Sequence, residues 1–238
     1  MVKRLSPGLR KALKWAAVGA LIAPLVPAVQ VACLRFGDPT TTAPIVRRWA
    51  HGKISGQPTT PVRYQPVPLQ EVPTTFLTCV WLSEDMRFFR HRGFDWTQIR
   101  IALEEAHASG KPARGASTIT QQCARSLFLW HGRSWLRKGL EAYYTVWMEG
   151  LLSKKRILEL YVNVIELGEG VYGVEAAAEH HYGVHAHELN LEQAAMLVAI
   201  LPKPKCWNPQ SPNQLMLKRE AMILKRSERA SIPLELIR

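Results

Sequence analysis

The sequence has few cysteines, few acidic residues and one long stretch that carries no charge. Its four cysteines are scattered and form no C-x-x-C pair, which argues against a zinc or dithiol site. Asp and Glu number 19 against 31 Lys and Arg, so the chain is basic. A basic chain suits anionic partners such as nucleic acid, lipid headgroups or phosphorylated substrates, and composition does not choose among them.

The uncharged stretch runs from Trp15 to Leu34, and about 20 such residues are what a bilayer crossing requires. Five basic residues precede it, and the positive-inside rule would keep that leader in the cytoplasm. The sequence therefore predicts a leader over 1–14 and a transmembrane helix over 15–35. A cleaved secretory signal and a buried core helix are the alternatives; the run is long for the first, and its prolines disfavour the second.

Beyond this stretch the sequence predicts a linker and one mainly α domain. Residues 36–64 are punctuated by proline, glycine and threonine, which predicts an extended connector. Helical periodicity then dominates, with polar caps at Asp95, Ser117 and Asn190. The domain should cover 65–226 and a tail 227–238. The expected helices lie near 70–90, 96–108, 117–128, 134–152, 154–165, 173–181, 190–200 and 212–226.

The stretch SEDMRFFRHRGFDW, residues 83–96, places Glu84 beside an apolar helical stripe. A carboxyl group on the apolar side of a helix is desolvated, which disfavours its charged form and suits proton transfer. A helix-end carboxylate that reaches solvent is the alternative. Asp85 and His91 crowd the same stretch, and for His91 we favour the role of a structural hydrogen-bond donor.

The stretch RGASTITQQ, residues 114–122, opens a predicted helix with hydroxyl and amide side chains. Free N–H groups at a helix start favour phosphate, and Ser117, Thr118 and Gln121 share roughly one face. Nearby arginines and a lysine could hold a diphosphate. There is no D-x-D motif, so a sugar-nucleotide donor on a Rossmann-like domain is not expected.

The next helix should bury Leu136, Leu140, Tyr143, Trp147 and Leu151. Arg137 and Glu141 lie four residues apart on its flank, either as a surface ion pair or as a second carboxylate in a cationic setting. Two carboxylates in unlike environments are the arrangement used for glycosyl transfer or hydrolysis.

Four histidines gather in HHYGVHAH, at 180–187, yet no acid or cysteine completes a familiar metal-ligand spacing. We therefore expect a solvent-exposed helix end there and no metal site.

These motifs, in this order, resemble the peptidoglycan glycosyltransferases of family 51, and within them the monofunctional biosynthetic enzymes of Gram-negative bacteria. GEGVYGVEAAAEHHYG, at 168–183, also follows the family's pattern, and the match covers roughly residues 65–225. The five matching blocks are EDMRFFRHRG at 84–93, GASTITQQ at 115–122, RKGLE at 137–141, KKRILELYVN at 154–163 and LPKPKCWNP at 201–209.

The resemblance implies a lysozyme-like α domain on the periplasmic side of the inner membrane that polymerises lipid II into glycan strands. It implies that Glu84 is the general base, which takes the proton from the GlcNAc 4-hydroxyl of the acceptor. Glu141 would be a second essential carboxylate, and undecaprenyl diphosphate would leave with inversion. The residues implied to bind substrate are Asp85, Phe88, His91, Ser117, Thr118, Gln121, Gln122, Arg125, Arg133, Arg137, Lys138 and Asn163.

The resemblance also implies partners and limits. Lipid II, the undecaprenyl-linked glycan, the inner membrane and cell-wall synthesis or division proteins are the expected partners, and nucleic acid is not. No cofactor is required, although Mg²⁺ or Mn²⁺ could assist at the diphosphate. Transpeptidation is not expected, because S-x-x-K and K-T-G are absent.

The sequence departs from the family's pattern at Ala116, Arg125 and Ser126, where Gly, Lys and Asn are usual. Arg differs from Lys in reach and geometry, so stabilisation of the leaving group could be altered. A muramidase-like hydrolase and a non-enzymatic, membrane-tethered binder are the alternative functions. Residues 123–136 are predicted to meet the bilayer through Phe128, Leu129, Trp130 and Trp135, with burial of Phe128 and Trp130 in the core as the alternative.

Overall fold

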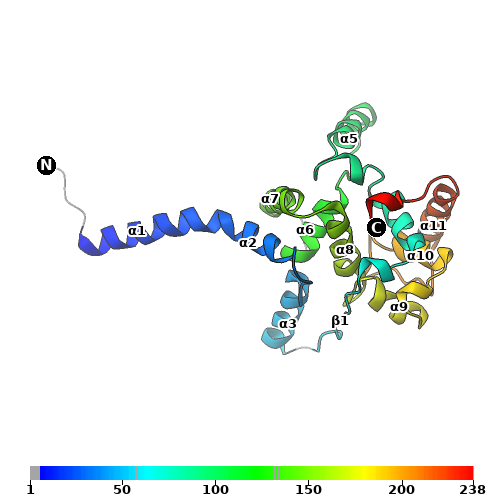
Figure 1. Cartoon of the computed structure of the whole chain (residues 1–238), viewed down its shortest axis with the longest axis horizontal. Coiled ribbons are helices and arrows are strands. Elements are labelled where there is room, and N and C mark those ends of the chain that lie inside the picture. The colour runs from blue at the N-terminus through cyan, green and yellow to red at the C-terminus, as the bar shows by residue number, and fades with distance from the viewer. Residues whose placement is uncertain (1–5, 57, 131, 133, 238) are drawn as a thin grey trace.

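The N-terminal part of the protein is a helical rod that projects away from the remaining helices (Figure 1). The structure is a computed structural model and describes residues 6–56, 58–130, 132 and 134–237. The rod consists of α1 (Pro7–Ile22), the 3-10 helix η1 (Ala23–Leu25) and α2 (Val26–Cys33). The single helix predicted for 15–35 is thus divided, since Pro24 and Pro27 lack the N–H that a continuous helix would use. In the described part of the chain, no helix combines the length and apolar character needed to cross a membrane.

The stretch predicted as an extended linker contains regular structure. Its helix α3 (Ala43–Ser55) packs against α6 (Ile119–Phe128), and the stretch ends in strand β1 (Arg63–Tyr64). Pro44 lies in the first turn of α3, where a missing N–H leaves no bond unmade, and Gly56 ends the helix. The prediction of an extended linker is therefore wrong over 43–55, because the prolines flank and start a helix there.

A small sheet joins this N-terminal stretch to the middle of the chain. Its strand order is β1-β3-β2, with β2 at Glu166–Gly168 and β3 at Val171–Tyr172. β1 runs parallel to β3, and β2 runs antiparallel to β3. The GEGVYG segment, 168–173, has the glycine spacing of a dinucleotide-binding motif, but its first two glycines lie at the turn between β2 and β3, and only Gly173 precedes a helix, α9 (Val174–Tyr182).

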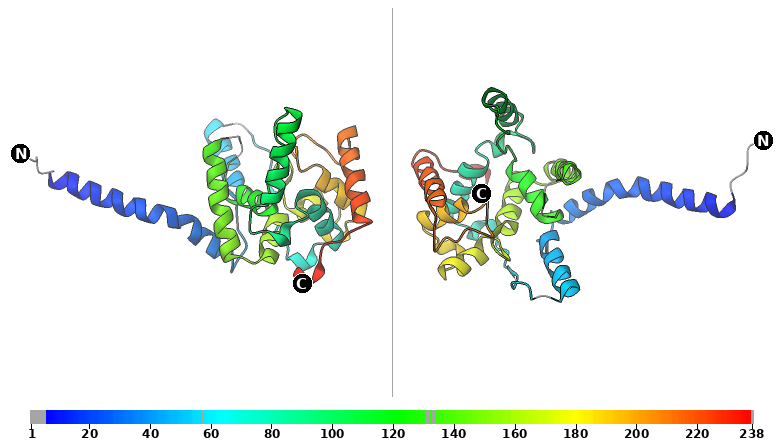
Figure 2. Two further views of the ribbon diagram at one scale, coloured as in Figure 1. Left: turned by 90° about the horizontal axis from the view of Figure 1, so that it is seen from above. Right: turned by 180° about the vertical axis from the view of Figure 1, so that it is seen from behind.

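α8 (Lys154–Val164) runs through the core of the helical domain, and Figure 2 shows this domain from above and from behind, with the rod projecting away from it. Residues 157–158 and 160–162 of α8 are almost fully buried. α6 packs against α8, while α10 (Leu191–Ala199) packs against α4 (Thr74–Glu84) and α11 (Gln214–Ser227). The other elements are η2 (Leu69–Glu71), η3 (Phe88–Arg90), α5 (Trp96–Ser109), α7 (Trp135–Leu151), α9 (Val174–Tyr182), η4 (Ala186–Glu188) and η5 (Leu234–Leu236).

The mainly α prediction is confirmed, with two changes near the site. The helix expected over 70–90 is divided into η2, α4 and η3, because the chain is extended at Val72 and Pro73 and leaves the helical conformation again at Asp85. The start of α6 is capped by Thr118 and not by Ser117. Glu84 therefore stands at a helix end, and Ser117 is left outside the helix.

The segment 123–136 is only partly exposed. Phe128 stacks on Tyr144 with 4.2 Å between the ring centroids and is partly buried against the core. Trp130 is 39% exposed, whereas Trp135 and Leu136, at the start of α7, are far more exposed. The apolar surface of this segment is thus carried by the first turn of α7.

Candidate active site

Glu84 lines a cavity of about 550 Å³ that opens between the end of α4, the start of α6 and one face of α11. The cavity collects side chains that are distant in the sequence. Its polar lining includes Ser83, Glu84, Asp85, Arg114, Ser117 and Arg219.

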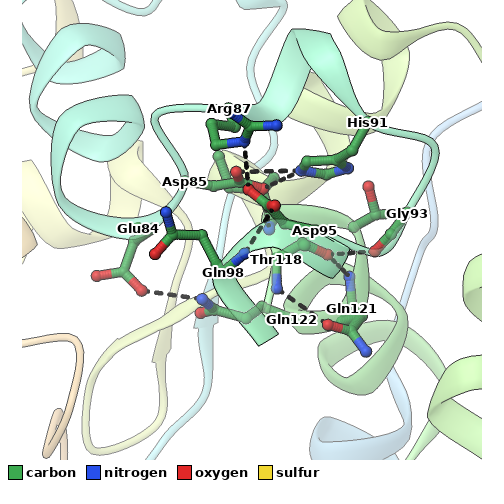
Figure 3. A network of polar contacts seen from close by, with 12 residues as sticks. Glu84, Asp85, Arg87, His91, Gly93, Asp95, Gln98, Thr118, Gln121 and Gln122 are labelled. Atoms are coloured by element: carbon green, nitrogen blue, oxygen red, sulfur yellow. Dashed lines mark hydrogen bonds and ion pairs between the residues drawn. The ribbon is translucent and has the colours of Figure 1, made fainter. Parts of the chain in front are cut away.

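The Glu84 carboxylate is held by polar neighbours (Figure 3). Gln122 Nε2 donates a hydrogen bond to Oε2 at 2.9 Å, and Ser83 Oγ donates to Oε1 at 3.0 Å. Arg219 Nη2 lies 3.9 Å from Oε1, and the Glu84 side chain is 14% exposed. Of the two settings that the sequence left open for Glu84, the structure has the second: Glu84 is a helix-end carboxylate that faces a cavity.

Tyr161 fixes the orientation of Gln122. Its O–H donates to Gln122 Oε1 at 3.2 Å, which leaves the amide nitrogen directed at Glu84. Burial raises the pKa of Tyr161 well above its ordinary value, so the hydroxyl keeps the proton that it donates. A hydrogen-bonded chain thus runs from α8 through α6 to the carboxylate at the end of α4.

Asp85 and His91 hold the start of α6 beside Glu84. Asp85 Oδ2 accepts the N–H of Ile119 at 3.0 Å and lies 3.0 Å from His91 Nε2 (Figure 3). A carboxylate at this position satisfies an N–H that the helix leaves free and complements the helix dipole. The contact between His91 and Asp85 agrees with the structural role that we favour for His91, and that role stays a prediction.

Thr118 and Gln121 form the cap of the same helix. Thr118 Oγ1 accepts the Gln121 N–H at 3.3 Å and donates to Gly93 O at 2.7 Å, while Gln121 Oε1 accepts the Thr118 N–H at 3.1 Å. Both side chains are buried. Of these two residues, which the resemblance assigns to substrate, only Thr118 also lines the cavity.

Asp85, His91 and Asp95 bring possible metal ligands within 4.8 Å of one another. Each carboxylate is already occupied by protein groups. Asp95 accepts the Gln98 N–H at 3.0 Å and pairs with Arg87 Nε at 2.9 Å, and Asp85 has the partners described above. This donor set therefore does not fit a divalent cation.

Glu141 is the centre of a second cluster, on α7. Its carboxylate is fully buried, with Arg137 Nη1 at 2.8 Å and Arg125 Nη1 at 3.9 Å from Oε2, and Lys138 Nζ in contact with Oε1. Three cations around one carboxylate leave the cluster positive, which suits a diphosphate. Lys138 Nζ also lies 3.3 Å from Ser117 Oγ, so Ser117 joins this cluster to the Glu84 cavity.

The remaining predicted residues lie apart from the cavity. Phe88 is fully buried, with Lys154 Nζ 4.4 Å from its ring centroid. Asn163 is buried and exchanges hydrogen bonds with the backbone of Val67 at 2.8 and 3.0 Å. Neither residue lines the Glu84 cavity, and Arg133 lies outside the described residues. Three positions differ from the family's usual residues. Ala116 lines the Glu84 cavity, and Arg125 and Ser126 line a smaller cavity.

Two arginines of α11 reach the Glu84 cavity and were not found from the sequence. Arg219 Nε donates to Ala199 O at 3.1 Å, and Arg226 Nη1 donates to Leu82 O at 3.0 Å. The sequence indicates only an amphipathic basic helix at this position. Which of its arginines meets Glu84 depends on how α10 and α11 pack against α4.

The histidine cluster is mostly exposed, as predicted, but His181 is an exception. It is half-buried, its Nε2 lies 2.7 Å from Leu167 O, and burial lowers its pKa. His185 Nδ1 lies 2.7 Å from Glu175, whose other oxygen accepts the Ala186 N–H at 2.8 Å. These contacts tie α9 to its neighbours.

A family model described as Transglycosylase matches residues 51–228. The chain belongs to the transglycosylase family. A relative from Pseudomonas entomophila (strain L48), named biosynthetic peptidoglycan transglycosylase, is 41% identical over 223 residues, which cover 94% of this chain and 91% of the relative. A relative of the same name from Chromohalobacter salexigens is 45% identical over 188 residues, which cover 79% of this chain and 78% of the relative.

Membership of the transglycosylase family confirms the resemblance that the sequence blocks indicated and identifies the protein as a glycosyltransferase. The alternative of a non-enzymatic, membrane-tethered binder is thereby disfavoured. The family match begins at residue 51, inside α3, and includes both carboxylate clusters.

Proposed function

We propose that this transglycosylase polymerises lipid II into linear glycan strands for cell-wall peptidoglycan and does not crosslink them. The observation that carries the proposal is the pair of unlike carboxylates joined through Ser117. Glu84 faces a cavity with room for a sugar, and Glu141 lies within a positive cluster. The printed names of the relatives support peptidoglycan as the product.

In the proposed reaction, Glu84 takes the proton from the GlcNAc 4-hydroxyl of lipid II as that oxygen attacks C1 of the donor MurNAc. The bond from C1 to the diphosphate oxygen breaks with inversion, and undecaprenyl diphosphate leaves. Its developing negative charge is met by Arg125, Arg137 and Lys138, and pre-placed cations of this kind lower the barrier.

Glu141 holds these cations in position. Without a carboxylate between them, Arg137 and Lys138 would repel each other and turn away from a common point. The proposed reaction requires no resident cofactor. If Mg²⁺ or Mn²⁺ assists at the diphosphate, the rate of glycan formation should fall when EDTA is added.

We further propose that residues 15–35 anchor the enzyme in the bacterial inner membrane, with leader 1–14 in the cytoplasm and the catalytic domain in the periplasm. The uncharged stretch and the basic leader support this orientation. The rod that holds this stretch projects from the domain (Figure 1), as an anchor for a catalytic domain outside the bilayer requires. The partners would be lipid II, the undecaprenyl-linked glycan and proteins of cell-wall synthesis or division.

Purified full-length protein should be incubated with lipid II in detergent, and the products resolved by gel. A ladder of lengthening glycan supports the proposal. Intact lipid II together with shortening of added glycan strands would contradict it and favour the muramidase-like hydrolase instead.

A further inference from the structure

A second large cavity lies between α3 and the β2–β3 hairpin. It has a volume of about 600 Å³, which falls within the range of cavities that bind small ligands. Among the described residues, its lining and that of the Glu84 cavity have no member in common. We call it the α3 cavity.

The α3 cavity adjoins the positive cluster around Glu141. A small cavity of about 50 Å³ shares Pro44 and Tyr172 with it and is lined by Arg125 as well. Arg125 Nη1 lies 3.9 Å from Glu141 Oε2. Arg125 and this small cavity therefore lie between the Glu141 cluster and the α3 cavity.

The lining of the α3 cavity combines cations, hydroxyl groups and one carboxylate, that of Glu169. Lys205, Glu169 and Tyr172 face it from the body of the domain, and its other polar side chains come from α3 and the loop that follows: Arg47, Arg48, His51, Thr59 and Thr60. Arg48 is fixed between Glu169, at 3.5 Å, and Glu166, at 3.8 Å. Fixed acids and cations together suit a ligand with many hydroxyls and isolated carboxylates better than a diphosphate.

The wall of this cavity is built into the domain. Arg63 N–H donates to Gly170 O at 2.8 Å, which fixes the end of the 58–64 segment on the hairpin. Gly170 has a φ of +76°, and a Cβ there would lie 3.0 Å from Pro61 O. The segment thus packs so closely that only glycine fits opposite it.

We propose that the α3 cavity binds the glycan strand already polymerised, with Arg47 and His51 contacting the carboxylates of its peptide substituents. This inference rests on the proposed function, because only a polymerase must hold a product while the next unit is added. An un-crosslinked peptidoglycan strand offers the sugar hydroxyls and the spaced carboxylates that this lining matches.

The test compares Arg47→Ala/His51→Ala with Lys53→Ala, all in the full-length protein. The three side chains are exposed on α3, and Lys53 does not line the cavity, so it serves as the matched control. Binding of isolated, un-crosslinked glycan strands that carry stem peptides should weaken about 10-fold or more in the double variant, the loss expected for charge-assisted hydrogen bonds. The same variant should make shorter glycan from lipid II, and Lys53→Ala should match the wild type in both measurements.

Unchanged strand affinity and unchanged glycan length in the double variant would overturn the inference, as would a wild-type protein that does not bind the strands. Failure of the proposed function gives a different result. If the wild type binds strands through Arg47 and His51 but never lengthens lipid II, the strand site stands and the polymerase does not.

Discussion

Tyr161 is separated from the Glu84 carboxylate by Gln122 alone, and its hydroxyl decides which end of that amide faces Glu84. Tyr161→Phe removes this restraint, so the Gln122 amide can turn over and present oxygen to the carboxylate. We expect kcat to fall by up to about 10-fold, the equivalent of one hydrogen bond, with little change in KM for lipid II.

Steady-state kinetics of lipid II consumption would measure both constants for Tyr161→Phe. A purely structural role of the hydroxyl predicts loss of stability with kcat and KM intact. That result, seen as a lower unfolding midpoint with wild-type kinetics, would contradict the positioning role.

Glu141 is the most enclosed charge of the site, with 0% of its side chain exposed, and Arg137 is nearly as buried. Glu141→Gln leaves the Arg137 guanidinium without its counter-ion, which should lower the free energy of unfolding by about 3 kcal/mol. Arg137→Met/Glu141→Leu removes both charges and should recover most of that loss while remaining inactive. Urea denaturation of the three proteins measures this, and a double variant no more stable than Glu141→Gln would contradict the account.

The sequence was sufficient to predict many of the side chains of the candidate site. It was not sufficient to predict which residues each of them contacts. Glu84, Glu141 and the cations around Glu141 were found, because charges at those spacings needed an explanation. The setting of Glu84 was not, since it depends on Gln122 and Arg219, which belong to two other helices. Only folding brings these three together.

At the scale of elements, the junction between the start of α6 and the loop before α5 positions the site. Gly93 has a φ of +85°, and a Cβ there would lie 2.6 Å from Thr145 Cγ2 on α7. Gly93→Ala should therefore destabilise the protein by about 3 kcal/mol, through both backbone strain and overpacking. It should also displace the carbonyl that Thr118 bonds, and so reduce activity.

Gly110→Ala is the matched control for Gly93→Ala. Its φ is +65° and its Cβ would meet no atom within 4 Å, so only the backbone cost of about 1 kcal/mol remains. Thermal unfolding of both variants gives the comparison. Equal losses of thermal stability in the two variants would mean that the close contact with Thr145 does not contribute to the destabilisation.

Helices could be predicted from the sequence where apolar residues recur at helical spacing. The prediction failed for the buried face of α7, where charged residues of the site are buried. On α7 the predicted core face includes Leu136, yet that residue is exposed, and Arg137 and Glu141 are buried instead. Periodicity assigned polar residues to the surface, whereas here they turn inward to face one another. Helix α3 was not predicted for a similar reason, because its prolines and polar residues resemble those of a linker.

At the scale of the whole molecule, side-chain contacts join α7 to the rod that we propose as the membrane anchor. Tyr143 and Tyr144 on α7 donate hydrogen bonds to Pro24 O at 2.6 Å and to Gln30 at 2.5 Å in the rod. Trp135, two turns earlier on α7, is 94% exposed. Exposed tryptophan beside an anchor is typical of a residue at a bilayer interface.

In proteoliposomes that contain doxyl-labelled lipids, Trp135 should contribute to the quenched tryptophan fluorescence together with Trp15 of the proposed anchor. Trp135→Phe should lower the quenched fraction, whereas Trp207→Phe, which removes a tryptophan packed against the core, should not. Equal quenching in wild type and Trp135→Phe would contradict a membrane contact at this turn.

The general base is the central claim, and one measurement tests it most directly: the rate of glycan formation from lipid II by full-length wild type, Glu84→Gln and Glu104→Gln. Glu104 is an exposed carboxylate on α5 that pairs only with Arg100 among the described contacts, so it serves as the matched control. The account predicts wild-type rates for Glu104→Gln and a loss of about 10²- to 10⁴-fold for Glu84→Gln, the usual contribution of a positioned base. A folded Glu84→Gln variant that makes glycan at the wild-type rate would contradict it.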